Sequence, residues 1–309
     1  MDNTVLCVVG PTACGKTKMG VALARRFHGE VVSVDSMQIY RGMTIGTAAP
    51  TAQETEGVPH HMIGVADPQE SWSAARFTAA ADACIQDILR RGKRPVLVGG
   101  TGLYLDALVR GTDFAAGSQG GVIRQRLQQR MERQGAAALL AELQTIDPAA
   151  AARLHLRDEK RIVRALEVYY ETGETITEHD RKSRETPPRY RALRIGLAFR
   201  DRADMWARID RRVDDMVAQG LLQEVETLLQ SGLPRDATAL QAIGYKQFLA
   251  VAEGRATVDE AIRSRQYAKR QLTWLRRDED IHWILWEKTP DFSAGLQNAT
   301  EFLLSAGVC

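Results

Sequence analysis

A glycine-rich loop lies ten residues into the chain and reads Gly10-Pro11-Thr12-Ala13-Cys14-Gly15-Lys16-Thr17. It fits the phosphate-loop pattern of glycine, four residues, and Gly-Lys-Ser/Thr, between a predicted buried strand at Val5–Val9 and a predicted helix at Lys16–His28. Glycines let the backbone curl so that several N–H groups point at one oxyanion, and the helix N-terminus adds its dipole. Lys16 adds a positive charge, and the Thr17 hydroxyl suits a Mg²⁺ ion. The loop predicts a site for a di- or triphosphate but does not identify the rest of the ligand.

Around the loop, short apolar strands alternate with helices. The strands are predicted at Val5–Val9, Val31–Val34, Pro95–Val98, Leu193–Phe199 and Ile281–Trp286. This alternation predicts an α/β fold, a P-loop NTPase-like parallel sheet flanked by helices. We expect this catalytic core to comprise residues 1–112 and 192–309.

The strand-like runs stop between Thr112 and Arg191, where the chain reads as helices only. Helices are predicted at Val122–Arg133, Ala136–Thr145 and Glu159–Thr172. A glycine-rich segment at 116–121 opens this region, and Thr-Pro-Pro-Arg at 186–189 closes it, which are boundary signals. We therefore expect an all-helical insertion domain over residues 113–191.

Composition limits the classes of protein that the chain can represent. The net charge is only +2 over 309 residues, so any surface for nucleic acid must be local. The four cysteines are scattered without metal-ligand or disulfide-framework spacing, which fits a reducing compartment. The chain enters a strand at once and has no apolar run of membrane-spanning length, so we expect no signal peptide, no membrane association and a cytoplasmic location.

Polar residues follow two further strands. Asp35 ends the second strand, and Thr101 lies in a Gly-Gly-Thr-Gly cluster at 99–102 after the third. Because ligands bind at the carboxyl ends of parallel strands, both are candidates for the site. Asp35 could act as a general base or reach Mg²⁺ through water, or it could cap a helix, and position alone does not decide between these. Thr101 is a cap or a hydroxyl aimed at the ligand, and the glycines permit a close approach by that ligand.

The adjacent pair His60-His61 has no companions at metal-ligand spacing. Neighbouring residues on a strand point to opposite faces, so packing or hydrogen bonding is the favoured interpretation over a metal site.

Two basic segments are candidates for a nucleic-acid surface. Arg161 and Arg164, three residues apart, share one face of a predicted helix. The segment 263–277 holds several arginines and a lysine, together with Trp274, and no acidic residue. A cationic helix face with an aromatic side chain suits a phosphate backbone, although most charge runs are only solvated helix faces.

In combination, these motifs resemble the tRNA dimethylallyltransferase family, also called the tRNA isopentenyltransferases. The resemblance extends to about Arg277 and rests on motifs at 10–17, 35–41, 46–47, 59–61, 99–104, 161–168, 243–245 and 269–276. The departures are minor. Cys14 replaces the usual serine, Ala49 a frequent lysine, Lys160 a common glutamine, and 155–158 reads His-Leu-Arg-Asp in place of His-Pro-Asn-Asp. Cys14 occupies a variable loop position, so its backbone role survives, whereas Ala49 takes away one potential cationic contact.

The resemblance implies transfer of a dimethylallyl group from its diphosphate to the exocyclic amine of adenosine 37 of tRNA, beside the anticodon. Asp35 would be the general base, and Thr101 would hydrogen-bond the amine or a diphosphate oxygen. Mg²⁺ on Thr17 is the implied cofactor. The diphosphate would be held by Gly10, Pro11, Thr12, Ala13, Cys14, Gly15, Lys16, Thr17 and Arg212.

The resemblance also implies contacts with the tRNA anticodon stem-loop, from which the adenine would be flipped into a channel. The adenine would be read by Asp35, Ser36, Met37, Gln38 and Thr101. The stem-loop would be contacted by Lys160, Arg161, Ile162, Val163, Arg164, Leu240, Gln241, Ala242, Ile243, Gly244, Tyr245, Lys269, Arg270, Gln271, Leu272, Thr273, Trp274, Leu275 and Arg276. We expect the insertion domain to close over the RNA and the protein to act as a monomer.

Two alternatives remain at this stage. A small-molecule kinase would share the phosphate loop and the parallel sheet, but it would leave the basic segment 263–277 without a role. A nucleotide-gated RNA-binding protein would explain that segment and reduce Asp35 and Thr101 to helix caps.

Overall fold

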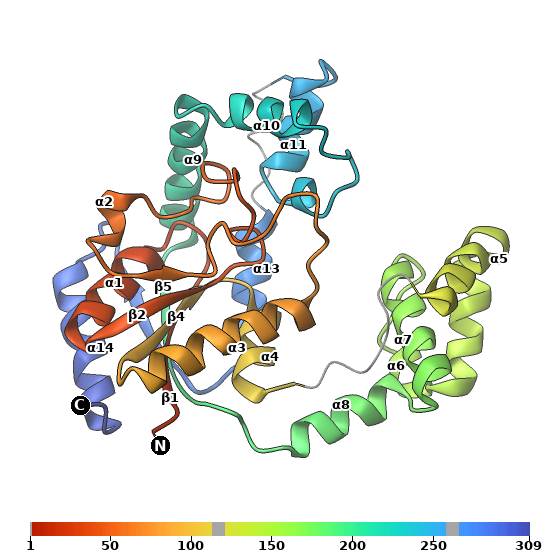
Figure 1. Ribbon diagram of the computed structural model, residues 1–309, viewed down its shortest axis with the longest axis horizontal. Coiled ribbons are helices and arrows are strands. Elements are labelled where there is room, and N and C mark those ends of the chain that lie inside the picture. Colours follow the sequence, from red (N-terminus) through yellow and green to blue (C-terminus); the bar gives the residue numbers. More distant parts are fainter. Residues whose placement is uncertain (1, 113–120, 258–265) are drawn as a thin grey trace. The chain divides into compact units, whose positions relative to one another are not determined.

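The computed structural model describes residues 2–112, 121–257 and 266–309, except for the side chains of Arg184 and of residues 266–270 (Figure 1). The chain divides into two compact units, one formed by Met1–Val109 with Arg189–Cys309 and the other by Arg110–Pro188. The boundaries expected from the sequence, 112/113 and 191/192, lie a few residues further along the chain. The two units are described separately below.

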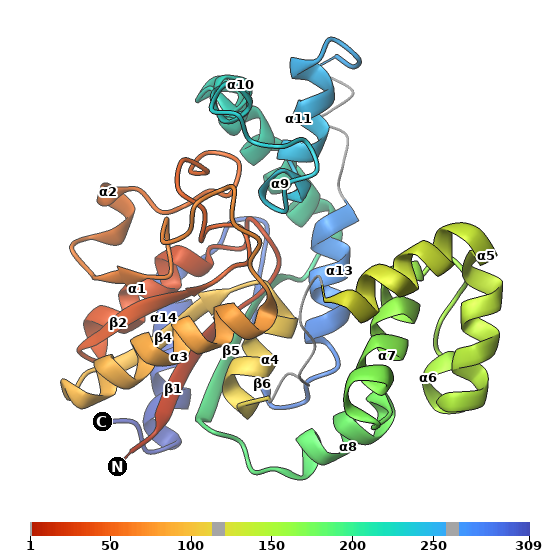
Figure 2. The same cartoon turned by 45° about the vertical axis from the view of Figure 1, so that its right-hand side comes forward.

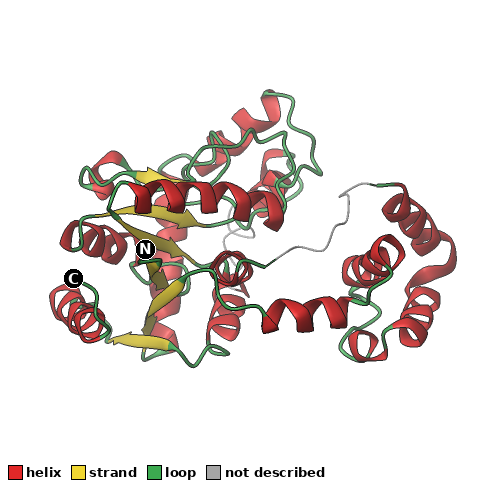
Figure 3. Cartoon of the chain, turned by 60° about the horizontal axis from the view of Figure 1, so that its bottom comes forward, coloured by secondary structure: helices red, strands yellow, loops and turns green. Residues whose placement is uncertain are grey.

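The first unit is built on one parallel sheet with the strand order β3-β2-β4-β1-β5-β6, seen in yellow in Figure 3. Its strands in the described residues are β1 (Thr4–Val9), β2 (Gly29–Val34), β3 (His60–His61), β4 (Arg94–Gly99), β5 (Arg191–Phe199) and β6 (Ile281–Trp286). The predicted parallel α/β fold is therefore confirmed. The sequence analysis had missed β3 as an element because two residues carry no periodic signal.

Strand β1 shows why these apolar runs become central strands. All its residues are buried. Val5, Cys7 and Val9 belong to the core on one face of the sheet, and Leu6 and Val8 to the core on the other. A strand covered on both faces needs a continuous apolar run, which is the pattern at 5–9.

Helices cover both faces. The core that contains Val5 takes buried side chains from α3 (Ala74–Arg90), α4 (Gly102–Arg110), α10 (Leu221–Gln230) and α11 (Tyr245–Ala252). The core that contains Leu6 takes them from α1 (Lys16–Arg26), α9 (Arg202–Ala218), α13 (Gln266–Leu275) and α14 (Phe292–Ser305). Two short helices, α2 (Ala52–Thr55) and the 3₁₀ turn Ala239–Gln241, complete this unit.

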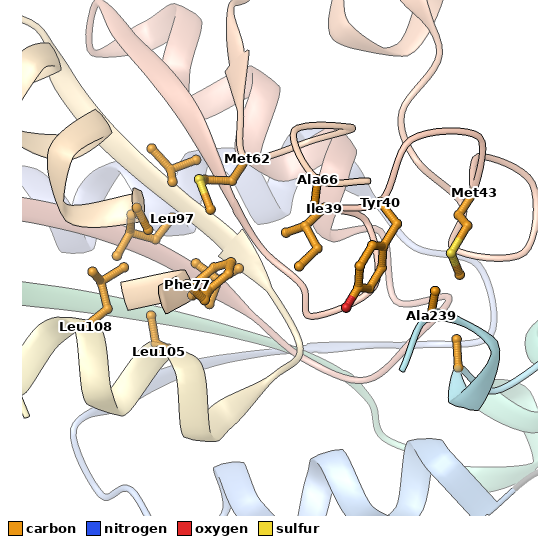
Figure 4. Packing of buried hydrophobic residues seen from close by; sticks show 14 of the residues in the cluster. Ile39, Tyr40, Met43, Met62, Ala66, Phe77, Leu97, Leu105, Leu108 and Ala239 are labelled. Carbon is orange, nitrogen blue, oxygen red and sulfur yellow. The ribbon is translucent and has the colours of Figure 1, made fainter. Parts of the chain in front are cut away.

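The loop after β2 is held by its own apolar side chains. Ile39, Tyr40 and Met43 are each 2% exposed or less and lie in the same core as Phe77 of α3 and Leu97 of β4 (Figure 4). Because this loop also carries Asp35, its packing fixes where the predicted general base stands.

The second unit is helical in all its described elements, labelled α5 to α8 in Figure 2. They are α5 (Val122–Ile146), α6 (Pro148–Ala151), α7 (Glu159–Thr172) and α8 (Ile176–Glu185). Gly135, with a φ of 78°, interrupts α5, so the two helices predicted at 122–133 and 136–145 are its two arms. Leu127, Leu139 and Leu143 of α5 pack with apolar side chains of α7 to form a separate core.

Among the helices of the described residues, none is long and apolar enough to cross a membrane.

Candidate active site

The phosphate loop connects β1 to α1, and three side chains from different elements hold its carbonyl oxygens. Lys16 Nζ donates to Pro11 O at 2.7 Å, Arg208 Nε to Ala13 O at 3.2 Å, and Trp286 Nε1 to Cys14 O at 2.9 Å. The N–H of Thr12 is engaged by Gln271 Oε1, and the other N–H groups of the turn and the N-terminus of α1 remain to meet an oxyanion.

The second glycine of the motif is required for two reasons. Gly15 has a φ of 90°, in the left-handed region, and a Cβ there would lie 2.4 Å from the Phe292 ring of α14. A larger residue would therefore be strained in its backbone and would also displace α14. The same Phe292 ring lies under Lys18 Nζ, 4.5 Å from its centroid.

Arg212 of α9 supplies a positive charge close to the phosphate loop. Its Nε is buried and has no hydrogen-bond partner in the part of the chain that the structure describes. Burial lowers the pKa of this guanidinium, and the nearby Asp35 carboxylate opposes that shift. A buried N–H donor that no described residue satisfies costs free energy, and an anionic ligand would supply the missing acceptor.

Lys16 shares this environment. Burial lowers the pKa of its ammonium, the Arg212 guanidinium lowers it further, and Asp35 opposes both effects. Two positive charges close enough for one to lower the pKa of the other favour a ligand with more than one negative charge, such as a diphosphate. Asp35 thus lies close enough to Lys16 and to Arg212 to interact electrostatically with both.

Asp35 has one oxygen engaged and one available. Its Oδ1 accepts the N–H groups of Met37 at 2.9 Å and Gln38 at 3.4 Å, which is the capping role considered as its alternative. Its Oδ2 accepts no hydrogen bond from any described residue. Asp35 can therefore cap this turn through Oδ1 and still accept a proton on Oδ2, and the capping bonds orient the carboxylate.

Thr101 lies next to the Asp35 loop. Its N–H donates to Val34 O at 3.4 Å, and its Oγ1 accepts the N–H of Ser36 at 3.3 Å. Strands β1, β4 and β2 are neighbours in the sheet, so the phosphate loop, Thr101 and Asp35 meet at one edge. A small pocket at this edge is lined by Val9, Val34, Gly99, Gly100, Thr101, Gly102, Leu105 and Leu275.

The predicted base-reading role of Gln38 needs correction. Its Oε1 accepts from Ser33 Oγ at 2.8 Å, and its Nε2 donates to the carbonyl oxygens of Thr47 and Ala48, each at 3.1 Å. Because both ends of the amide are engaged within the protein, Gln38 holds the loop instead of presenting free groups to a base. Ser36 and Met37 are half-buried in the same turn.

Segment 240–245 also proves largely internal. Leu240, Ala242 and Tyr245 are buried and Gln241 is exposed, while Ile243 and Gly244 are half-buried. The predicted RNA contacts of the three buried side chains are thus corrected, because they pack in the core shared with α10 and α3.

Tyr245 also reveals a residue that the sequence analysis missed. Its hydroxyl donates to the Glu224 carboxylate of α10, which further accepts the N–H groups of Thr44, Ile45 and Gly46. Several acids lie on α9 and α10, and no spacing in the sequence distinguishes Glu224 from them.

Helix α13 turns one face inward and one outward. Gln271, Leu272 and Leu275 are buried, so their predicted RNA contacts are corrected, whereas Thr273, Trp274 and Arg276 are exposed. Trp274 Nε1 donates to Asp106 Oδ2 at 2.9 Å, and the Arg277 guanidinium lies 5.8 Å from the Trp274 ring centroid. The predictions for the Lys269 and Arg270 side chains, and for Arg263, lie outside the described residues.

In the helical unit, Lys160 and Arg161 are exposed on α7, as an RNA-contacting surface requires. Ile162 and Val163 are buried in the core of that unit, so the prediction that their side chains contact RNA is corrected. Arg164 pairs with the buried Glu167 at 2.7 Å, which gives it a structural role.

The histidine pair has hydrogen-bond partners within the protein. His60 Nδ1 lies 2.8 Å from Val58 O, and His61 Nε2 lies 2.8 Å from Glu30 Oε2. Glu30 is 2% exposed on its side chain and also pairs with Arg91 and Lys93. These contacts agree with the structural interpretation of the pair.

Fold and site together define a phosphate-loop α/β protein with Lys16, Arg212 and the Asp35 carboxylate close to the loop. The family profile described as IPP transferase matches residues 38–278, and the one described as isopentenyl transferase matches residues 3–66. The chain belongs to the IPP transferase family.

Individual relatives agree with this assignment. The tRNA dimethylallyltransferase of Acetivibrio thermocellus is 40% identical over 313 residues, covering 100% of this chain and 99% of that protein. That of Halalkalibacterium halodurans is 46% identical over 289 residues, covering 92% and 91%.

Solved structures extend the likeness to the fold. The full-length tRNA isopentenylpyrophosphate transferase of Bacillus halodurans has a TM-score of 0.70 at 38% identity, with 99% of each chain covered. A eukaryotic dimethylallyltransferase acting on tRNA has a TM-score of 0.79 at 30% identity, with 97% of this chain and 77% of that chain covered.

Proposed function

We propose that this protein transfers a dimethylallyl group from dimethylallyl diphosphate to the exocyclic amine of adenosine 37 of tRNA, giving N6-dimethylallyladenosine and diphosphate. The observation that carries the proposal is the unpartnered Arg212 Nε beside the phosphate loop, at the strand ends that also hold Asp35 and Thr101. The family assignment and the tRNA-acting relatives support the same activity.

The cations serve the leaving group. When the allylic C–O bond breaks, the carbon gains cationic character and the departing diphosphate gains negative charge. Lys16 and Arg212 would stabilise that negative charge electrostatically. A phosphate loop recognises oxyanions, so it serves a diphosphate leaving group as readily as it serves ATP.

The carboxylate serves the nucleophile. The exocyclic amine of adenine is a poor nucleophile because its lone pair is delocalised into the ring. As the new C–N bond forms, Asp35 Oδ2 takes the proton that the amine loses, while Oδ1 stays bonded to the turn. Thr101, whose Oγ1 accepts the N–H of Ser36 next to Asp35, would hydrogen-bond the amine or a diphosphate oxygen.

The site also fits a Mg²⁺ ion. The Thr17 hydroxyl lies in the first turn of α1, directly after the phosphate loop, and offers the kind of oxygen donor that Mg²⁺ prefers. When bound on Thr17, the ion would neutralise diphosphate charge.

We assign the RNA contacts to the exposed side chains of the predicted RNA-binding segments. The anticodon stem-loop would be met by charge, hydrogen bonds and an aromatic ring. These come from Lys160 and Arg161 of the helical unit and from Thr273, Trp274 and Arg276 of α13.

We further infer a cytoplasmic monomer. The four free cysteines fit a reducing compartment, and every proposed catalytic group comes from one chain.

A matched pair of variants tests the catalytic assignment. Asp35→Asn keeps the capping oxygen but cannot accept the proton, so prenyl transfer to an anticodon stem-loop should fall by about 100-fold or more. Asp291→Asn is the control, because Asp291 Oδ1 also accepts the N–H groups two and three residues on. Equal activities of the two variants, measured as mass gained by the RNA, would remove Asp35 from the mechanism.

The same assay separates the alternatives. A kinase would consume ATP and leave the RNA mass unchanged, and an RNA-binding protein without chemistry would shift the RNA in a gel but add no mass.

A further inference from the structure

Helix α13 reaches the site through the buried amide of Gln271, which is 6% exposed. Its Oε1 accepts the N–H of Thr12 in the phosphate loop at 2.9 Å, and its Nε2 donates to Gly100 O at 3.2 Å. One side chain therefore joins the loop after β1 to the loop after β4, the two loops that carry Lys16 and Thr101.

The glycines of the second loop make room for this helix. A Cβ on Gly100 would lie 2.1 Å from Gln271 Nε2, and a Cβ on Gly102 would lie 2.0 Å from Trp274 Cδ1. The sequence analysis had assigned this space to a ligand. In the structure it admits Gln271 and Trp274, so the contact between α13 and the site is close and specific.

The outward face of the same helix is open to a partner. Thr273, Trp274 and Arg276 are exposed, and the Arg277 guanidinium lies over the Trp274 ring. Trp274 packs against Gly102 with one part of its ring and is 38% exposed, so it reaches both the loop after β4 and the surface. It lies three residues from Gln271, less than one helical turn away. A ligand held on Trp274 and Arg276 would therefore restrain Gln271 directly.

We propose that Gln271 is a positioning residue that couples RNA docking on α13 to the phosphate loop, so that a bound anticodon stem-loop tightens diphosphate binding. This inference rests on the proposed function. Gln271 contacts neither substrate in this account. It sets the position of Thr12 relative to Gly100, and with it the shape of the loop that holds the diphosphate.

The direction of the effect follows from preorganisation. RNA on the outward face would hold α13 in place, so Gln271 would keep the phosphate loop in its binding geometry and less ordering would remain for the diphosphate to bring about. Coupling of this kind is reciprocal, so diphosphate would tighten RNA binding by the same factor.

Calorimetry with inorganic diphosphate and Mg²⁺ tests the coupling without turnover. Each titration is done with the free protein and with the protein saturated by an anticodon stem-loop. In the wild type we expect the stem-loop to lower the diphosphate Kd by about 5-fold or more, the lower end of common coupling factors.

The variant Gln271→Met fills the same space but cannot bridge the loops, and Gln271→Glu keeps an acceptor for Thr12 but has no donor for Gly100. In both, the ratio of the two Kd values should approach one. Gln297→Met, on the exposed surface of α14, should keep the wild-type ratio.

Two outcomes would overturn the inference and leave the proposed function standing. One is a wild-type ratio near one in a protein that transfers the prenyl group. The other is an unchanged ratio in the Gln271 variants, even if both Kd values rise or the melting temperature falls, because a purely structural role predicts that pattern. A wild type that neither binds the stem-loop nor prenylates it would refute the proposed function itself.

Discussion

The Tyr245 hydroxyl on α11 donates a hydrogen bond to the Glu224 carboxylate on α10, and the same carboxylate accepts three consecutive backbone N–H groups at 44–46. The neighbouring carbonyl groups of Thr47 and Ala48 accept from Gln38, in the turn that Asp35 caps. A chain of hydrogen bonds therefore runs from two peripheral helices to the proposed general base.

Replacing this carboxylate should loosen the loop. Glu224→Gln would set an amide N–H₂ against donors that now meet an oxygen, so we expect the free energy of unfolding to fall by about 1–3 kcal/mol. Chemical denaturation measures the loss. Glu226→Gln, two residues along the same helix, is the control, and equal losses in the two variants would show that Glu224 has no special role.

The hydrogen bonds to the Glu224 carboxylate also predict that the stability of the protein depends on pH. Burial opposes ionisation of Glu224, but hydrogen bonds from Ile45, Tyr245, Gly46 and Thr44 outweigh it and hold the pKa of this carboxyl below its ordinary 4.5. A lowered pKa in the folded state stabilises the protein above pH 4.5, and this contribution is lost as pH falls through the folded-state pKa. In denaturation measured from pH 6 to 3, the wild type should therefore lose more stability than Glu224→Gln. If the stability of the two proteins fell in parallel with pH, this role of Glu224 would be contradicted.

Replacing Arg212 should weaken diphosphate binding without lowering the stability of the protein. Arg212→Met removes a cation whose buried Nε has no partner among the described residues, so the melting temperature should stay the same or rise. Because a hydrogen bond to a charged group is worth about 1.5–3 kcal/mol, diphosphate affinity should fall by about 10- to 100-fold. Calorimetry and thermal unfolding on one preparation check both statements. A large loss of stability without loss of affinity would mean that Arg212 is structural.

Lys16 should make diphosphate binding sensitive to alkaline pH. Burial, reinforced by Arg212, lowers the pKa of Lys16 from its ordinary 10.5, and loss of the proton removes a charge that the ligand needs. Affinity should therefore begin to fall at a pH below 10.5, as Lys16 loses its proton. Lys16→Arg stays charged throughout and should flatten the profile, whatever its affinity at neutral pH. If both proteins gave the same profile, another group would be responsible.

In the helical unit, Glu167 neutralises two arginines. Its side chain is fully buried and accepts from Arg124 and Arg164, each at 2.7 Å. Glu167→Gln would leave both guanidinium groups with a neutral partner, and we expect a loss of about 2–3 kcal/mol in this unit. Limited proteolysis within Arg110–Pro188 reports it. Glu132→Gln, at an exposed position on α5, should leave the rate of cleavage unchanged. Equal cleavage of the two variants would count against the predicted role of Glu167.

The long apolar runs and the phosphate loop made the sheet predictable, since a strand buried on both faces has no polar alternation to mistake for a helix. The site residues Lys16, Asp35 and Thr101 could be placed because carboxyl ends of parallel strands converge. Among the described strands, only β3 was not predicted, because two residues are too few to show a hydrophobic periodicity.

The roles of helical side chains could not be predicted in the same way. Gln271, Glu224 and Arg164 lie on amphipathic helices with several polar neighbours, and only tertiary packing decides which polar group turns inward. The resemblance indicated segments that matter for RNA but did not separate their buried side chains, such as Ile162 and Leu272, from exposed ones, such as Arg161 and Trp274.

The most direct measurement is the mass and position of the modification after wild-type protein is incubated with Mg²⁺, dimethylallyl diphosphate, ATP and an anticodon stem-loop. The account predicts one dimethylallyl group on the adenosine beside the anticodon, formed together with diphosphate and without consumption of ATP. Unmodified RNA with hydrolysed ATP, or a prenyl group on another nucleotide, would contradict it.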